Sequence, residues 1–210
     1  YGPMSAQNDT AIARADSAVG AIMDGIAARK LGATVNLIVV ADHGMAPVST
    51  QRAIYLDDYV TMSDVEVVDW TPVGAIAPLN GSLEKVYAAL KDKNPHLQVF
   101  KKGEVPARFH FNAHKHITPL VLIAEEGWTI TTRARAANPP RGANGGAHGY
   151  DHQLPSMGAL FVAAGPAFRS GVVVPPFQNV HVYSLLAELL KLKPAATDGS
   201  VASVRALLRP

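Results

Sequence analysis

The residues best suited to chemistry are an adjacent carboxylate and imidazole, Asp42 and His43, followed by Gly44. They come directly after residues 35–40, a short apolar run rich in β-branched side chains that is typical of a buried strand. Neighbouring side chains on a strand face opposite sides, but at a strand's end the chain turns, and Gly44 permits that turn. Asp42 and His43 could then converge on one metal ion, because aspartate and neutral histidine are normal zinc ligands.

His148 is the second candidate metal ligand. It lies at the end of residues 133–149, a stretch rich in Arg, Ala, Asn, Pro and Gly that predicts a long loop. A long loop inside a compact fold is more often functional than idle. The residues alone leave plainer roles open: Asp42 could cap a turn while His43 makes an ordinary hydrogen bond, and His148 could be a solvated loop residue.

The remaining chemistry-bearing residues predict no site. His110, His114 and His116 alternate as on the edge of a strand, where exposure explains their polarity. The sequence has no phosphate-binding P-loop, no dinucleotide glycine motif and no nucleophile elbow. It also contains no cysteine, which excludes disulfides and thiolate metal sites, so a metal must be held by histidine and carboxylate.

Composition bounds the class of protein. The chain has 210 residues, of which 48% are hydrophobic and 17% charged, so it can bury a core and is not a disordered segment. Its formal net charge of +2 is too small to indicate a nucleic-acid polymer as partner. No apolar run approaches the roughly 18–20 residues of a membrane-spanning helix, so we expect no membrane span.

The elements that must position the candidate ligands alternate between helices and apolar strands. The predicted helices cover residues 5–30, 82–91 and 180–192. The predicted strands cover residues 35–40, 65–68, 97–100, 108–111, 120–124 and 159–164. This order predicts an α/β fold with a largely parallel central sheet. The weaker pattern over about residues 47–118 predicts a small α+β insertion at one edge of that sheet.

Taken in order, the motifs resemble the type I phosphodiesterase / nucleotide pyrophosphatase family of the alkaline phosphatase superfamily. The resemblance rests on Asp42-His43-Gly44-Met45, Glu126-Gly127-Trp128, His148-Gly149-Tyr150-Asp151, Pro155-Ser156-Met157 and the tail over residues 164–183. Their order and spacing match across nearly the whole chain. The resemblance implies an alkaline-phosphatase-like sandwich, of which residues 1–210 form the C-terminal part of one catalytic domain.

The resemblance also implies a metal centre. The family holds two zinc ions beside a threonine nucleophile and uses no other cofactor. Asp42 and His43 match ligands of the first zinc, and His148 matches a ligand of the second. The nucleophile and the other ligands lie upstream in the family, before a Gly-Pro that Tyr1-Gly2-Pro3 resembles. We therefore expect this chain alone to be inactive and to associate with the missing N-terminal portion.

The implied activity is zinc-dependent hydrolysis of phosphodiester or pyrophosphate bonds in nucleotides or related diesters. Two alternatives are a phosphomonoesterase or phosphonate hydrolase of the same superfamily, and a non-catalytic binding or scaffold domain that kept the fold. The choice between nucleotide and phospholipid substrates stays open, because the family's recognition residues lie largely upstream. The resemblance further implies a periplasmic or secreted bacterial protein.

Overall fold

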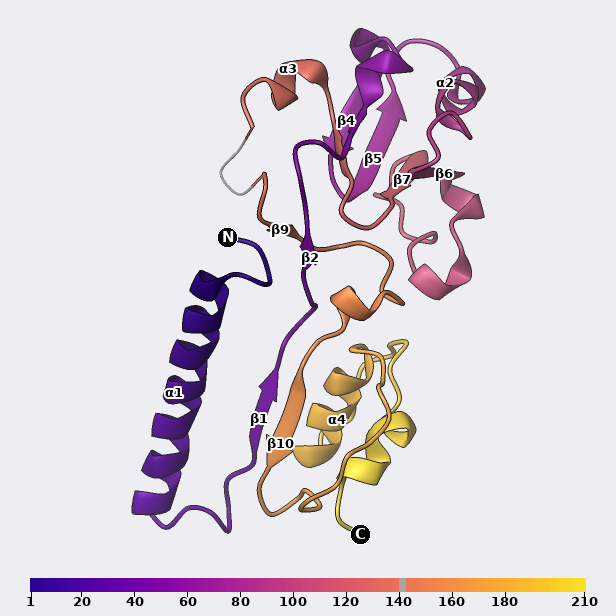
Figure 1. The fold of residues 1–210 in the computed structure, drawn as a ribbon. Coiled ribbons are helices and arrows are strands. Elements are labelled where there is room, and N and C mark those ends of the chain that lie inside the picture. Colours follow the sequence, from indigo (N-terminus) through magenta and orange to yellow (C-terminus); the bar gives the residue numbers. More distant parts are fainter. Residues whose placement is uncertain (140–142) are drawn as a thin grey trace. The chain divides into compact units, whose positions relative to one another are not determined.

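The chain divides into two units in the computed structural model, which describes residues 1–139 and 143–210 (Figure 1). The first unit contains residues 1–12 and 43–158, and the second contains residues 13–42 and 159–210. Each unit encloses a hydrophobic core of its own. Among the described residues, no helix combines the length and the hydropathy that crossing a membrane requires.

A four-stranded antiparallel sheet is the main element of the first unit (Figure 1). Its order is β4 (Val65–Asp69), β5 (Val73–Pro78), β7 (Leu120–Ala124) and β6 (Leu97–Lys101). Every residue of β7 is buried, because its apolar side chains alternate between two clusters on opposite faces. Leu120 and Leu122 join the larger cluster, and Val121 and Ile123 join the smaller. The apolar run over 120–124 correctly predicted this strand.

Helix α2 (Leu83–Leu90) confirms the predicted helix over 82–91. The Ser82 side chain accepts a hydrogen bond from the Lys85 N–H at 3.2 Å and so caps the helix. Val86 and Leu90, four residues apart, are buried on its inner face. The strands expected over 65–68 and 97–100 are likewise confirmed by β4 and β6.

The strand expected over 108–111 is wrong. A short 3₁₀ helix, η4 (Ala107–Phe109), lies there instead, and His110 ends it in the left-handed region with φ +49°. A residue with that backbone cannot continue an extended strand. The strand-like stretch over 108–111 is therefore a turn.

Smaller elements complete the first unit. β3 (Ala53–Tyr55) pairs in parallel with β8 (Thr129–Thr131), and β2 (Ala46–Pro47) pairs antiparallel with β9 (Gly146–Ala147). Other 3₁₀ helices in this unit are η1 (Leu56–Asp58), η2 (Met62–Asp64), η3 (Lys102–Glu104) and η5 (Pro155–Met157). The stretch 133–149 is not loop throughout, because it holds helix α3 (Arg133–Ala136) and β9; residues 140–142 of it lie outside the described residues.

The second unit packs helix α4 (His181–Leu189) and the 3₁₀ helix η6 (Val201–Leu207) around a small core. β1 (Leu37–Val40) pairs antiparallel with β10 (Phe161–Ala164), and the two lie side by side in Figure 1. These elements confirm the helix expected over 180–192 and the strand expected over 159–164. The buried members of the core are Phe168, Leu185, Val204 and Leu207.

The strand over 35–40 was expected in a parallel sheet with both faces buried, and this is wrong for the described residues. β1 is antiparallel to its described neighbour, none of its residues is fully buried, and Val40 is 46% exposed. The described strands form three two-stranded sheets and the four-stranded one, and only β3 and β8 pair in parallel. The mixed α/β character is confirmed, but a largely parallel central sheet is not seen in this part of the protein.

Helix α1 (Ala6–Ala28) confirms the helix expected over 5–30. The Ser5 hydroxyl accepts from the Asn8 N–H at 3.2 Å, as expected of an N-cap residue. The helix nevertheless buries none of its residues, and Ile12, Ile22 and Met23 on it are exposed.

Candidate metal site

The structure brings together two of the three predicted ligands, His43 and His148. Their rings stack with centroids 3.6 Å apart and an interplanar angle of 14°. Both residues belong to the first unit, although they are far apart in the sequence. The pairing of β2 with β9 explains how they meet, because His43 shortly precedes β2 and His148 directly follows β9. In an antiparallel pair those two positions lie at the same end.

Gly44 fixes the backbone beside His43. Its N–H donates to the Met157 carbonyl oxygen at 3.0 Å. A side-chain carbon at Gly44 would lie 2.1 Å from the Ser156 carbonyl oxygen and 2.7 Å from that of Gly158. Only glycine therefore fits, and this close approach seats the histidine-bearing turn against residues 156–158.

The hydrogen bonding of His43 suits a metal ligand. Its Nδ1 lies 2.8 Å from the Gly44 carbonyl oxygen. A carbonyl oxygen can only accept, so Nδ1 carries a hydrogen, and in the neutral imidazole the lone pair then lies on Nε2. Histidines that ligate metals commonly donate their other ring N–H to such a carbonyl, which fixes the tautomer and the ring orientation.

The stacked geometry favours a pair of ions over a single one. An imidazole directs its lone pair in the plane of its ring, and the planes of His43 and His148 are nearly parallel. One ion shared between them would lie far out of both planes, whereas two ions could each lie in one plane. The two nearly parallel imidazoles are thus better suited to holding separate ions, as the family resemblance implies, than to sharing one.

Asp42 directly precedes His43 but belongs to the second unit. Its backbone carbonyl oxygen accepts a hydrogen bond from Asn179 Nδ2 at 3.0 Å, within that unit. Within the described residues, no cluster of three or more His, Cys, Asp or Glu side chains is assembled for a metal. Asp42 therefore stays a predicted ligand.

The residues after His148 are tightly packed. Gly149 has φ +97°, and a side-chain carbon there would lie 3.2 Å from Pro72 Cγ. Tyr150 is buried, and its hydroxyl donates to the Trp128 carbonyl oxygen at 3.0 Å. Burial raises the pKa of Tyr150 to about 12. The phenol thus stays neutral at ordinary pH, as suits a residue that packs and anchors the loop.

An ion pair that no sequence pattern indicated anchors the end of this segment. Arg108 Nη1 donates to Asp151 Oδ1 at 2.6 Å, and Nη2 donates to Oδ2. The Gln153 N–H donates to the same Oδ1 at 3.0 Å. The hydrogen-bonded guanidinium of Arg108 holds the pKa of the Asp151 carboxyl below its usual 3.8.

This shift predicts an acid-dependent contribution to stability. Because the pKa of Asp151 is lower in the folded than in the unfolded state, the ion pair stabilises the fold fully above about pH 4. That stability is lost as the pH falls through the lower, folded-state value. Urea unfolding of the full-length protein between about pH 5 and about pH 3 should show a smaller loss of stability for Asp151→Asn than for wild type. Asp16→Asn, an exposed carboxylate on α1, is the control; identical pH profiles for Asp151→Asn and wild type would contradict the expectation.

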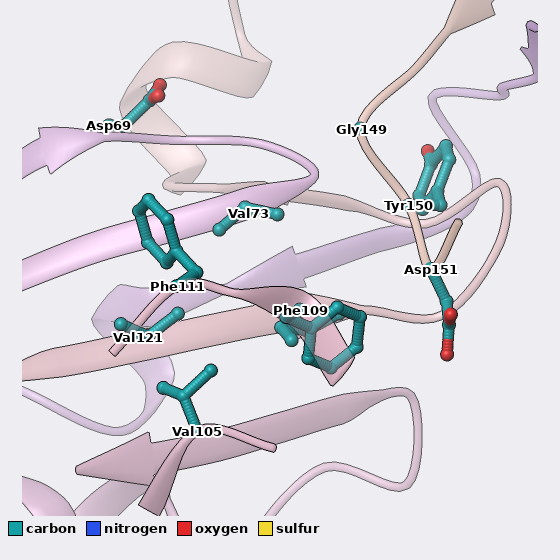
Figure 2. Close-up of a pocket in the computed structure, with 10 residues that line it drawn as sticks. Asp69, Val73, Val105, Phe109, Phe111, Val121, Gly149, Tyr150 and Asp151 are labelled. Atoms are coloured by element: carbon teal, nitrogen blue, oxygen red, sulfur yellow. The ribbon is translucent and has the colours of Figure 1, made fainter. Parts of the chain in front are cut away.

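A pocket of about 300 Å³ lies in the first unit beside the segment that follows His148. Figure 2 shows Phe109 and Phe111 facing Val73 and Val121 of the sheet, with Asp151 at one end. Its walls are therefore mainly apolar, and two carboxylates, Asp69 and Asp151, line it as well. Three other histidines make ring contacts elsewhere. The ring centroids of His96 and Trp128 are stacked 3.7 Å apart, and those of His114 and His116 are 4.9 Å apart in an edge-on arrangement.

Comparisons with known proteins agree with the motifs. A family model described as type I phosphodiesterase / nucleotide pyrophosphatase matches residues 1–151. Ectonucleotide pyrophosphatase/phosphodiesterase family member 7 of Mus musculus is 36% identical over 215 residues, which cover 100% of this chain and 48% of that protein. Bis(5'-adenosyl)-triphosphatase of Mus musculus is 37% identical over 209 residues, covering 99% and 44% respectively.

A solved structure is similar over the same extent. The murine ectonucleotide pyrophosphatase/phosphodiesterase 5, an inactive threonine-to-alanine variant in complex with AMP, superposes with a TM-score of 0.88 at 36% identity. The match covers 99% of this chain and 54% of that one. The chain thus spans about half the length of the proteins it matches.

Proposed function

Because this chain belongs to the type I phosphodiesterase / nucleotide pyrophosphatase family, we propose that the protein carrying it hydrolyses phosphodiester or pyrophosphate bonds of nucleotides or related diesters. The observation that carries the proposal is the stacked pair of His43 and His148 at the end of the β2–β9 pair. Relatives with that activity in their names match nearly the whole chain. A nucleotide substrate is supported by the AMP complex of the murine relative and by the dinucleotide named for the triphosphatase.

The proposed metal centre contains two zinc ions. Asp42 and His43 would hold the first, and His148 the second. When bound, such ions would neutralise the phosphoryl oxygens and stabilise the attacking and leaving oxygens of an in-line displacement. The residues of this chain would orient the ligand side chains. The hydrogen bond to the Gly44 carbonyl keeps the lone pair of a neutral His43 on Nε2, and buried Tyr150 anchors the segment that carries His148.

The proposed nucleophile is a threonine outside this chain. The inactive threonine-to-alanine variant of the murine relative supports that assignment. Asp42, His43 and His148 supply only part of the expected ligand set, so the rest would come from an N-terminal portion that associates with this chain. The exposed apolar residues Ile12 and Ile22 of α1, and Val162 of β10, offer surface for such an association. The complete protein would then hold the alkaline-phosphatase-like sandwich with its largely parallel sheet.

The competing enzyme class is a phosphomonoesterase or phosphonate hydrolase, and substrate preference separates it. The full-length protein is expected to hydrolyse bis-nitrophenyl phosphate in preference to the mono-nitrophenyl ester, with nitrophenolate release as the measurement. The isolated 210-residue chain is expected to release none, since its metal centre is incomplete. A preference for the monoester would refute the diesterase assignment. A periplasmic or secreted location is also part of the proposal and rests on the family resemblance alone.

A further inference from the structure

The ion pair between Arg108 and Asp151 joins two segments that are distant in sequence. Both terminal nitrogens of Arg108 donate to the two carboxylate oxygens of Asp151, so the contact is bidentate. A bidentate pair of two planar groups fixes orientation as well as distance. Asp151 lies three residues after His148, at the far end of the short segment whose other contacts are those of Gly149 and Tyr150.

Arg108 is itself held on the four-stranded sheet. Its guanidinium carbon lies 4.0 Å over the centroid of the Phe109 ring. Phe109 packs against the cluster that contains Val121 of β7, and its ring meets that of His152 edge-on at 5.6 Å. The pair therefore connects the segment after His148 to β7, every residue of which is buried. Asp151 lies three residues after His148, so the backbone of residues 148–151 links the ion pair to the stacked imidazoles.

We propose that Arg108 is a positioning residue for His148: through Asp151 it holds the histidine-bearing segment so that the imidazole keeps its place beside His43 for the second zinc ion. The inference rests on the proposed function, since it takes His148 to be a metal ligand. The contribution of this partly exposed ion pair to stability, which the acid dependence of unfolding measures, is small compared with the effect expected on zinc binding. Groups that orient metal ligands, however, commonly change metal affinity by roughly 10- to 100-fold. The expected effect is therefore on zinc binding rather than on folding.

The test is the zinc affinity of the full-length protein, measured by competition with a chromophoric chelator. Arg108→Gln is expected to weaken binding of the second zinc ion roughly 10- to 100-fold, while the melting temperature of the zinc-free protein changes little. Arg133→Gln is the matched control. Arg133 also makes a multidentate ion pair, to Asp58 at 2.8 and 2.9 Å, and its guanidinium lies 4.6 Å over the Tyr55 ring. The Arg133→Gln variant should bind zinc with the affinity of the wild-type protein.

Two further variants separate positioning from a general loss of packing. Asp151→Asn should reproduce the Arg108→Gln defect, and the double variant should bind zinc no more weakly than either single one, because both changes remove the same contact. Arg108→Lys keeps the positive charge but cannot make the bidentate contact of a guanidinium, so it should also weaken zinc binding. This variant is the test if Arg108→Gln fails to fold. Wild-type affinity in Arg108→Lys, or losses that add in the double variant, would overturn the inference.

His148→Ala, measured in the same series, separates this inference from the proposed function. If His148→Ala loses an ion while Arg108→Gln binds zinc as wild type does, only the positioning role fails. If His148→Ala retains both ions, His148 is not a ligand, and the proposed metal centre fails together with the inference.

Discussion

His148→Ala in the full-length protein is expected to lose about one of two bound zinc ions and to reduce diester turnover by roughly two orders of magnitude or more. The reason is that alanine removes the only described side chain proposed for the second ion, whose charge stabilises one oxygen of the displacement. Metal content by elemental analysis, together with steady-state kinetics on a nitrophenyl diester, measures both effects. Wild-type protein that fails to hold about two ions would instead favour the non-catalytic scaffold.

His116→Ala is the matched control for that substitution. His116 is an exposed histidine of the same unit, and its described ring contact is with His114. Its loss should leave both zinc content and turnover nearly unchanged. Indistinguishable kinetics for His148→Ala and His116→Ala would refute the assignment of His148.

Gly44→Ala is expected to destabilise the protein strongly. The added carbon would lie 2.1 Å from one backbone carbonyl oxygen and 2.7 Å from another, and backbone cannot swing aside as a long side chain can. Overpacking of this kind typically costs about 1–3 kcal/mol and occasionally more. That corresponds to a fall in melting temperature of several degrees or more for a domain of this size. Differential scanning calorimetry of the full-length protein measures it.

Gly103→Ala provides the comparison, because a side-chain carbon at Gly103 would meet nothing within 4 Å. It should leave the melting temperature within about a degree or two of wild type. If Gly44→Ala were as stable as Gly103→Ala, the close seating of the His43 turn against residues 156–158 would be wrong.

The spacing of apolar residues correctly predicted the helices and strands whose burial follows from their own side chains. The helix over 82–91 and the strand over 120–124 were found because apolar spacing reports directly on packing. Strand partners were harder to predict, since an apolar run such as residues 35–40 says nothing of what pairs with it. β1 accordingly pairs antiparallel with its described neighbour, β10, where a parallel neighbour was expected. The strand over 108–111 failed because the positive φ of His110 has no compositional signal.

The candidate site could be predicted only in part, because local motifs indicate single residues and not the distant residues that contact them. His43 and His148 were recognised by local motif, and their stacking agrees with a shared site. The contacts that support them come from residues far away in sequence: Arg108 for Asp151, Trp128 for Tyr150, and Ser156 for Gly44. No single-sequence pattern links such residues, because each contact depends on how the intervening chain folds.

The short pair of β2 with β9 has a consequence for how the site assembles. Closing a chain of this length for a two-residue ladder would cost far more entropy than the ladder returns. The four-stranded sheet lies between the two segments in sequence. Its folding shortens the effective loop and so lowers this entropic cost. The affinity of the proposed centre for zinc would therefore be thermodynamically linked to the folding of that sheet. A substitution that destabilises the core around β7 would therefore raise the zinc concentration that the protein requires, although β7 is remote from both histidines.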